Sequence, residues 1–74
     1  MSEHSKSIEE LEDDPKILER EGWYLVTFYQ SHHGEDCLIA HQKAIETASQ
    51  RAQQVGIRSF TYNTVTYYEV WSRA

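Results

Sequence analysis

The chain has little cysteine, proline or glycine: its 74 residues include one cysteine, one proline and three glycines. A single cysteine cannot close an intrachain disulfide, so a disulfide scaffold is excluded and a reducing compartment is favoured. No apolar run approaches the roughly 18 residues that a membrane span needs, and the acidic start has no hydrophobic signal segment. We therefore expect a cytoplasmic protein without membrane association.

Positive charge is also scarce. The chain has seven lysines and arginines against twelve aspartates and glutamates, a formal net charge of -5. Residues 1–22 carry eight acids and three bases, whereas residues 23–74 carry four of each. Because a negative chain repels phosphate instead of releasing its counterions, we expect no direct nucleic-acid binding.

Aromatic side chains follow the opposite distribution, since all nine lie beyond residue 22. This contrast predicts a flexible acidic arm over residues 1–13 and a single α+β domain over residues 14–74. The arm is either a solubilising tail or an electrostatic contact for a basic partner protein. In the second interpretation, the acidic residues that bind the partner are Glu9, Glu10, Glu12, Asp13 and Asp14.

The first half of the domain contains signals for a short helix and a strand. Asp14 followed by Pro15 is typical of a helix start, and Gly22 is a natural stop, so a helix is expected over residues 15–21. The next seven residues, WYLVTFY, have strand composition. A polar turn over residues 30–36 and an apolar stretch over residues 37–40 then suggest a hairpin.

In the second half of the domain, the spacing of apolar residues becomes that of a helix from Gln42 onward. A helix is expected from there to Gly56, with one buried face made by Ile45, Ala48, Ala52 and Val55. Residues 58–71 return to strand composition, with a bulge or tight turn at Asn63–Thr64. The predicted order is α-β-β-α-β: a small antiparallel sheet of three or four strands, one packed helix and a short N-terminal helix.

Residues that could support chemistry are few. His4, His32, His33, His41 and Cys37 are of types that zinc accepts, but their spacing matches no strong motif. Cys37 is expected to be a small buried hydrophobe because no base and orienting group accompany it. The paired carboxylates lie in the predicted arm, which cannot hold them rigidly. We therefore expect no catalytic residues, no metal and no cofactor.

Residues 17–33, ILEREGWYLVTFYQSHH, resemble the opening of HicA-type mRNA interferase toxins. The matching positions, in order, are Gly22, Trp23, Leu25, Val26, Ser31 and His32. The resemblance implies a double-stranded-RNA-binding-like domain in which His32 is the catalytic residue. Gln30 stands where the family has a glycine, and Thr27 and Tyr29 stand where it has basic residues.

In size, charge and lack of catalytic motifs, the chain is similar to phage-encoded regulators that bind a host protein. Such a resemblance implies a non-enzymatic protein-binding regulator that inhibits host nucleic-acid machinery, such as bacterial RNA polymerase or a defence nuclease. Acidic groups steer a protein to a basic groove, and Trp and Tyr dominate interface hot spots. The expected anchors are Tyr67, Tyr68 and Trp71. The alternatives are the HicA-type toxin and a single-stranded nucleic-acid binder that stacks bases on tyrosines.

Overall fold

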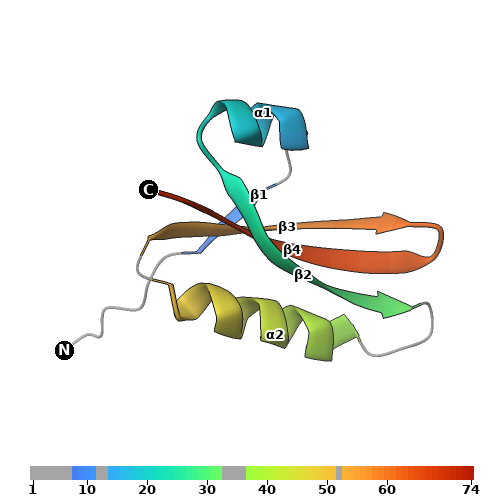
Figure 1. Cartoon of the computed structure of the whole chain (residues 1–74). Coiled ribbons are helices and arrows are strands. Elements are labelled where there is room, and N and C mark those ends of the chain that lie inside the picture. The colour runs from blue at the N-terminus through green and yellow to red at the C-terminus, as the bar shows by residue number, and fades with distance from the viewer. Residues whose placement is uncertain (1–7, 12–13, 33–36, 52) are drawn as a thin grey trace.

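A computed structural model describes residues 8–11, 14–32, 37–51 and 53–74. Within these residues the chain is an α+β domain with a four-stranded sheet and two helices, as Figure 1 shows. In chain order the elements are β1 (Glu9–Leu11), α1 (Pro15–Arg20), β2 (Tyr24–His32), α2 (Cys37–Ser49), β3 (Gln54–Tyr62) and β4 (Val65–Arg73). The α+β class is confirmed.

The sheet is mixed, which corrects the expectation of a purely antiparallel one. Its strand order is β1-β3-β4-β2, with β4 antiparallel to both of its neighbours and β1 parallel to β3. β1 and β3 are separated in the chain by α1, β2 and α2, a connection long enough for parallel pairing.

β1 also revises the boundary expected at residue 14. Residues 9–11 pair with β3, and Leu11 is buried. Leu11 lies directly over Gly56, where an added Cβ would come within 2.7 Å of the leucine side chain. The apolar contact of Leu11 therefore ties this part of the predicted arm to the sheet. The remainder of that arm, residues 1–7 and 12–13, lies outside the described residues.

The turn predicted at Asn63–Thr64 is confirmed. These two residues join β3 to β4 and have positive φ angles of 54° and 64°. Two successive left-handed residues give the type of turn whose twist matches that of a hairpin.

α2 begins five residues earlier than the spacing of apolar residues predicted, at Cys37 instead of Gln42. Residues 37–40 are its first turn, so the predicted strand there is wrong, and so is the predicted helix start at Gln42. Its buried face is an alanine stripe, Ala40, Ala44 and Ala48, whereas Ile45 is 38% exposed. Val55 and Gly56, which the pattern placed at the end of the helix, belong to β3. Short apolar runs do not distinguish strand from helix, and packing on the sheet decides the outcome.

α1 has defined ends. The Asp14 carboxylate accepts a hydrogen bond from the Lys16 backbone N–H at 2.8 Å, and Pro15 occupies the first turn. Gly22, with φ of 96°, lies just beyond the helix and turns the chain towards β2. Leu18 is buried, whereas Ile17, the residue before it, is 38% exposed. This short helix is therefore held to the sheet mainly through Leu18.

The core consists of two clusters, one on each side of the sheet. On the α2 side, Ala44 and Ala48 pack with residues of β3 and β4, namely Val55, Ile57 and Val70. On the α1 side, Leu18 packs with Leu11, Trp23 and Trp71. Figure 1 shows that α2 runs along one side of the sheet, whereas α1 lies over one end of the other side. The rest of the α1 side is without a helix within the part of the chain that the structure describes.

Candidate interaction surface

Aromatic side chains from three neighbouring strands meet on the α1 side of the sheet, beyond the end that α1 covers. Phe60 of β3 stacks on Tyr67 of β4, with ring centroids 5.1 Å apart and planes 20° apart. Phe28 of β2 contacts the same tyrosine at 6.1 Å in a tilted arrangement. Tyr62, two residues after Phe60, extends this row towards the hairpin. We call Phe28, Phe60, Tyr62 and Tyr67 the aromatic surface.

The aromatic surface is open to solvent. Phe28 is 50% exposed and Tyr62 is 68% exposed, while Phe60 and Tyr67 are half-buried. Large apolar side chains that gather on an exposed face, instead of being scattered singly, mark interaction sites on soluble proteins.

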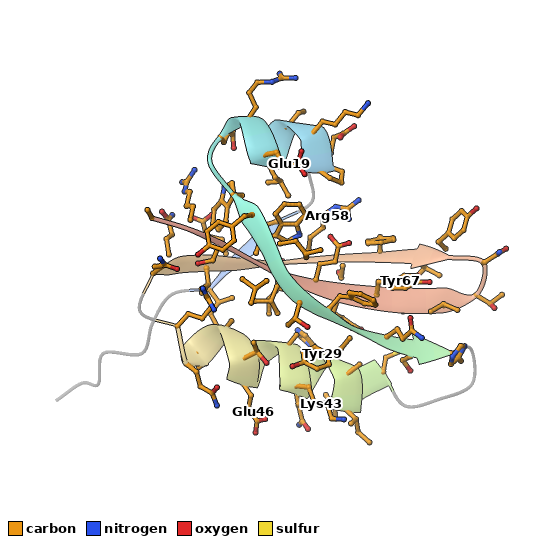
Figure 2. All side chains as sticks on the ribbon, viewed as in Figure 1. Glu19, Tyr29, Lys43, Glu46, Arg58 and Tyr67 are labelled. Carbon is orange, nitrogen blue, oxygen red and sulfur yellow. The ribbon has the colours of Figure 1, made fainter. Side chains whose placement is uncertain are left out.

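A polar bridge holds the aromatic surface against the buried core. The Arg58 guanidinium lies 4.3 Å from the Phe60 ring centroid, and its Nη1 donates to Glu69 Oε1 at 2.8 Å. The same carboxylate oxygen accepts a hydrogen bond from Trp71 Nε1 at 2.9 Å. Figure 2 shows Arg58 on the α1 side of the sheet. Glu69 thereby links the buried Trp71 to Arg58, which lies over the ring of Phe60.

The opposite side of the sheet is closed by α2. The Tyr29 and Thr47 hydroxyls are 2.7 Å apart, and Figure 2 shows Tyr29 between β2 and α2. His41 stacks on Tyr68 with centroids 5.1 Å apart. Burial raises the pKa of the Tyr68 hydroxyl, and the neighbouring Cys37 raises it further. Tyr68 is thus engaged with α2 and does not belong to the aromatic surface.

A hydrogen-bond network occupies the end of the sheet where β2 begins. The Tyr24 hydroxyl donates to Gln53 Oε1 at 2.7 Å and accepts from Arg51 Nη2 at 3.2 Å. The bond from Arg51 is the main reason why the pKa of Tyr24 is lowered, and Ser72 adds to the effect. At the same end, the Arg73 guanidinium lies 4.5 Å from the Trp23 ring centroid. Together with Arg58 over Phe60, this makes two pairs on the α1 side of the sheet in which an arginine lies over an aromatic ring.

The three expected aromatic anchors occupy three different environments. Tyr67 lies at the centre of the aromatic surface, and Tyr68 faces α2. Trp71 is only 3% exposed and packs beneath α1, so the expectation that it anchors a partner is corrected to a role in the core. Neighbouring residues on a strand point to opposite sides, which separates Tyr67 from Tyr68. Phe28 and Phe60 were not singled out from the sequence, although both share the side of Tyr67 by strand register.

The predicted acidic residues are likewise divided. Glu9 and Glu10 are exposed on β1, where Glu9 Oε2 accepts a hydrogen bond from Gln54 at 3.2 Å. Asp14 caps α1. Glu12 and Asp13 lie outside the described residues. Two of the five acids are therefore available on the sheet edge, and a third has a structural role.

The candidate catalytic residue of the HicA resemblance, His32, lies exposed at the end of β2, next to the buried Ser31. Among residues 8–11, 14–32, 37–51 and 53–74, no three His, Cys, Asp or Glu side chains are grouped in a way that could hold a metal ion. Cys37 is a free, half-buried thiol in the first turn of α2. Neither helix of the described chain is long and apolar enough to cross a membrane.

Comparisons with known proteins found no family model, no curated protein and no solved structure that matches this chain.

Proposed function

We propose that this chain is a non-enzymatic protein-binding regulator that contacts its partner through the aromatic surface. The observation that carries the proposal is the contact of Phe28, Phe60 and Tyr67 on an uncovered part of the sheet. In a domain of 74 residues, buried rings of this size add strongly to core packing, as Trp23 and Trp71 do here. Phe28 is instead 50% exposed, and Phe60 and Tyr67 are partly exposed, so these rings supply the apolar centre that protein interfaces use.

The negative net charge of the chain supports a partner with a basic surface. The chain carries a formal charge of -5, and Glu9 and Glu10 are exposed at the β1 edge. Arg58 and Arg73 each place a guanidinium over a ring on the α1 side of the sheet, so a partner's arginine has a ready mode of contact with the aromatic surface. The partner class we propose is a host protein that handles nucleic acid, such as bacterial RNA polymerase or a defence nuclease. Occupying its basic groove would inhibit it.

One observation favours a second candidate, a single-stranded nucleic-acid binder. Phe60 and Tyr67 are flat, adjacent and on a sheet face, which is the arrangement on which unpaired bases stack. The net charge of -5 opposes this candidate, because phosphate binding needs a positive surface. The arginine nearest to these rings, Arg58, is already paired with Glu69.

Surface plasmon resonance with immobilised bacterial RNA polymerase core enzyme tests the proposal. We expect the wild-type chain to bind and the double variant Phe28→Ala/Phe60→Ala to bind at least about 30-fold more weakly, as loss of hot-spot residues implies. The matched control is Leu38→Ala/Ile39→Ala, which removes two exposed apolar side chains from α2. It should change the affinity less than about threefold. Failure of the wild type to bind, or equal losses in both double variants, would contradict the proposal.

Two further measurements on the same proteins separate the alternatives. Binding of a labelled oligothymidylate that disappears in Phe28→Ala/Phe60→Ala would replace the proposed function with base stacking. RNA cleavage by the wild type that disappears in His32→Ala, with the fold intact, would establish the HicA-type activity. We expect neither binding to the oligonucleotide nor cleavage of RNA.

A further inference from the structure

The two outer strands of the sheet differ in how they are protected from pairing with another chain. β2 is an edge strand of nine residues, Tyr24–His32, with the sequence YLVTFYQSH. It contains no proline and no acidic, lysine or arginine side chain. Within the part of the chain that the structure describes, only β4 pairs with it. Its one irregularity is a shift of register between Leu25 and Thr27, which leaves Thr27 to His32 in regular pairing.

β1, at the opposite edge, has the features by which natural proteins prevent such pairing. It is three residues long, and two of the three, Glu9 and Glu10, are exposed carboxylates. Short, charged edge strands do not add further strands, whereas long, uncharged ones present a row of free N–H and C=O groups. Among the residues that the structure describes, one edge of the sheet is thus protected and the other is left without a pairing strand.

From this contrast we infer that β2 is a self-association edge: it pairs antiparallel with β2 of a second copy. A twofold axis perpendicular to the sheet makes two identical edge strands antiparallel, keeps corresponding faces of the two sheets on the same side and gives a closed dimer. The resulting sheet has the order β1-β3-β4-β2-β2-β4-β3-β1. Each acidic β1 edge then lies at a far end, so the exposed Glu9 and Glu10 of the two copies are kept apart while uncharged strands meet.

The aromatic surface gives a second reason to expect another copy of this chain at β2. Phe28 is the middle residue of β2, is 50% exposed and lies on the same side of the sheet as Tyr67. Antiparallel pairing about the middle of β2 brings the two Phe28 rings close together, where aromatic cross-strand pairs are favourable. The two aromatic surfaces then join into one across the dimer. The dimer does not depend on the proposed partner, but it would present that partner with a doubled surface.

Sedimentation equilibrium of the full chain over a wide concentration range tests the inference. We expect the mass to rise from one to two chains with concentration. Gln30→Lys places a charged side chain at an exposed position of β2, which is a feature by which natural edge strands resist pairing, and should weaken the dimer at least about fivefold. Ser59→Lys, at an exposed position of the inner strand β3, is the matched control and should leave the dimer unchanged. Equal effects of the two lysines would contradict pairing at β2.

Amide hydrogen exchange of the wild-type chain tests the β2 dimer without any variant. In a monomer, alternate N–H groups of β2 point away from β4 and exchange rapidly. In the proposed dimer they become protected, and their protection increases with protein concentration. A chain that stays monomeric at every concentration, or a dimer in which these amides remain unprotected, would overturn the inference. The polymerase assay with Phe28→Ala/Phe60→Ala is scored separately, so failure of the dimer and failure of the proposed function are distinguishable.

Discussion

The α2 side and the α1 side of the sheet are built from the same strands but are covered to different extents. The thirteen-residue α2 places alanines at positions 40, 44 and 48 against the sheet over Val55, Ile57 and Val70. The six-residue α1 buries Trp71 and Trp23 at one end of the other side. Beyond that end two rings of the aromatic surface, Phe28 and Tyr62, are exposed and the other two are half-buried. Aromatic residues in this chain therefore divide into those that build the core and those that the core leaves outside.

The covered and the uncovered part of the α1 side lie within four residues of each other along β3. Gly56 and Phe60 point to the same side of the sheet, four residues apart. At Gly56 the side chain of Leu11 occupies the space that a Cβ would need. At Phe60 the contacts are Tyr67 and Arg58. The smallest residue lies where β1 and the apolar cluster cover the sheet, and the large ring lies where they do not.

The largest expected effect is at Trp71, on the covered end. Trp71→Ala should lower the free energy of unfolding by about 3–5 kcal/mol, because it leaves a cavity beneath α1 and removes a hydrogen bond to Glu69. Urea denaturation followed by circular dichroism measures this loss. Tyr67→Ala, on the uncovered end, is the comparison and should cost about 1 kcal/mol. Similar losses in the two variants would remove the distinction between the ends.

A smaller effect is expected where β1 meets β3. Gly56→Ala should cost about 1–3 kcal/mol, since the new Cβ would lie 2.7 Å from Leu11 unless β1 shifts. Faster amide exchange confined to β1 would locate the damage. Ser59→Ala, three residues along the same strand and exposed, should be close to neutral. A neutral Gly56→Ala would show that β1 does not pack as described.

Substitutions in the aromatic surface should affect binding more than stability, in contrast to substitutions in the core. Phe28→Ala/Phe60→Ala should cost only about 1 kcal/mol in stability while reducing binding strongly, because contacts between partly exposed rings contribute less to folding than buried ones. Thermal unfolding measured beside the binding assay tests both statements. A loss of several kcal/mol in this variant would mean that these rings belong to the core.

The smallest effects concern two tyrosine hydroxyls. Tyr68 faces α2, where burial and Cys37 raise its pKa, whereas the bond from Arg51 lowers the pKa of Tyr24. A folded-state pKa above the unfolded value means that the contribution of Tyr68 to stability is complete below about pH 10 and is lost as the pH rises further. Carbon chemical shifts of the tyrosine rings, followed from neutral to alkaline pH, should show Tyr24 ionising before Tyr68. The reverse order would contradict the two environments.

Local chemistry in the sequence was sufficient to predict several elements. β2 has β-branched and aromatic composition, and Asn63 is a residue type that tolerates the left-handed backbone of a hairpin turn. Gly22 was expected to end the first helix, and it lies just beyond α1 with a positive φ. These features depend on neighbours in the chain, so the sequence contains the information directly.

Features that depend on distant contacts were not predictable in the same way. The first turn of α2 was interpreted as a strand because CLIA alone is ambiguous, and its helical state follows from packing Ala40 on the sheet. The strand at residues 9–11 forms because Gly56, far along the chain, leaves room for Leu11. Trp71 and Tyr67 look alike as anchors in the sequence. Their exposures differ because α1 covers one and not the other.

The most direct test of the central claim, that the uncovered end of the α1 side is a binding surface, is a nuclear magnetic resonance titration. Isotope-labelled chain receives substoichiometric bacterial RNA polymerase core enzyme, and the loss of each backbone amide signal is recorded. The account predicts that the signals of Phe28, Phe60 and Tyr67 broaden first, while those of Leu38 and Ile39 on α2 broaden least. Broadening that begins on α2, or no selective broadening at all, would contradict it.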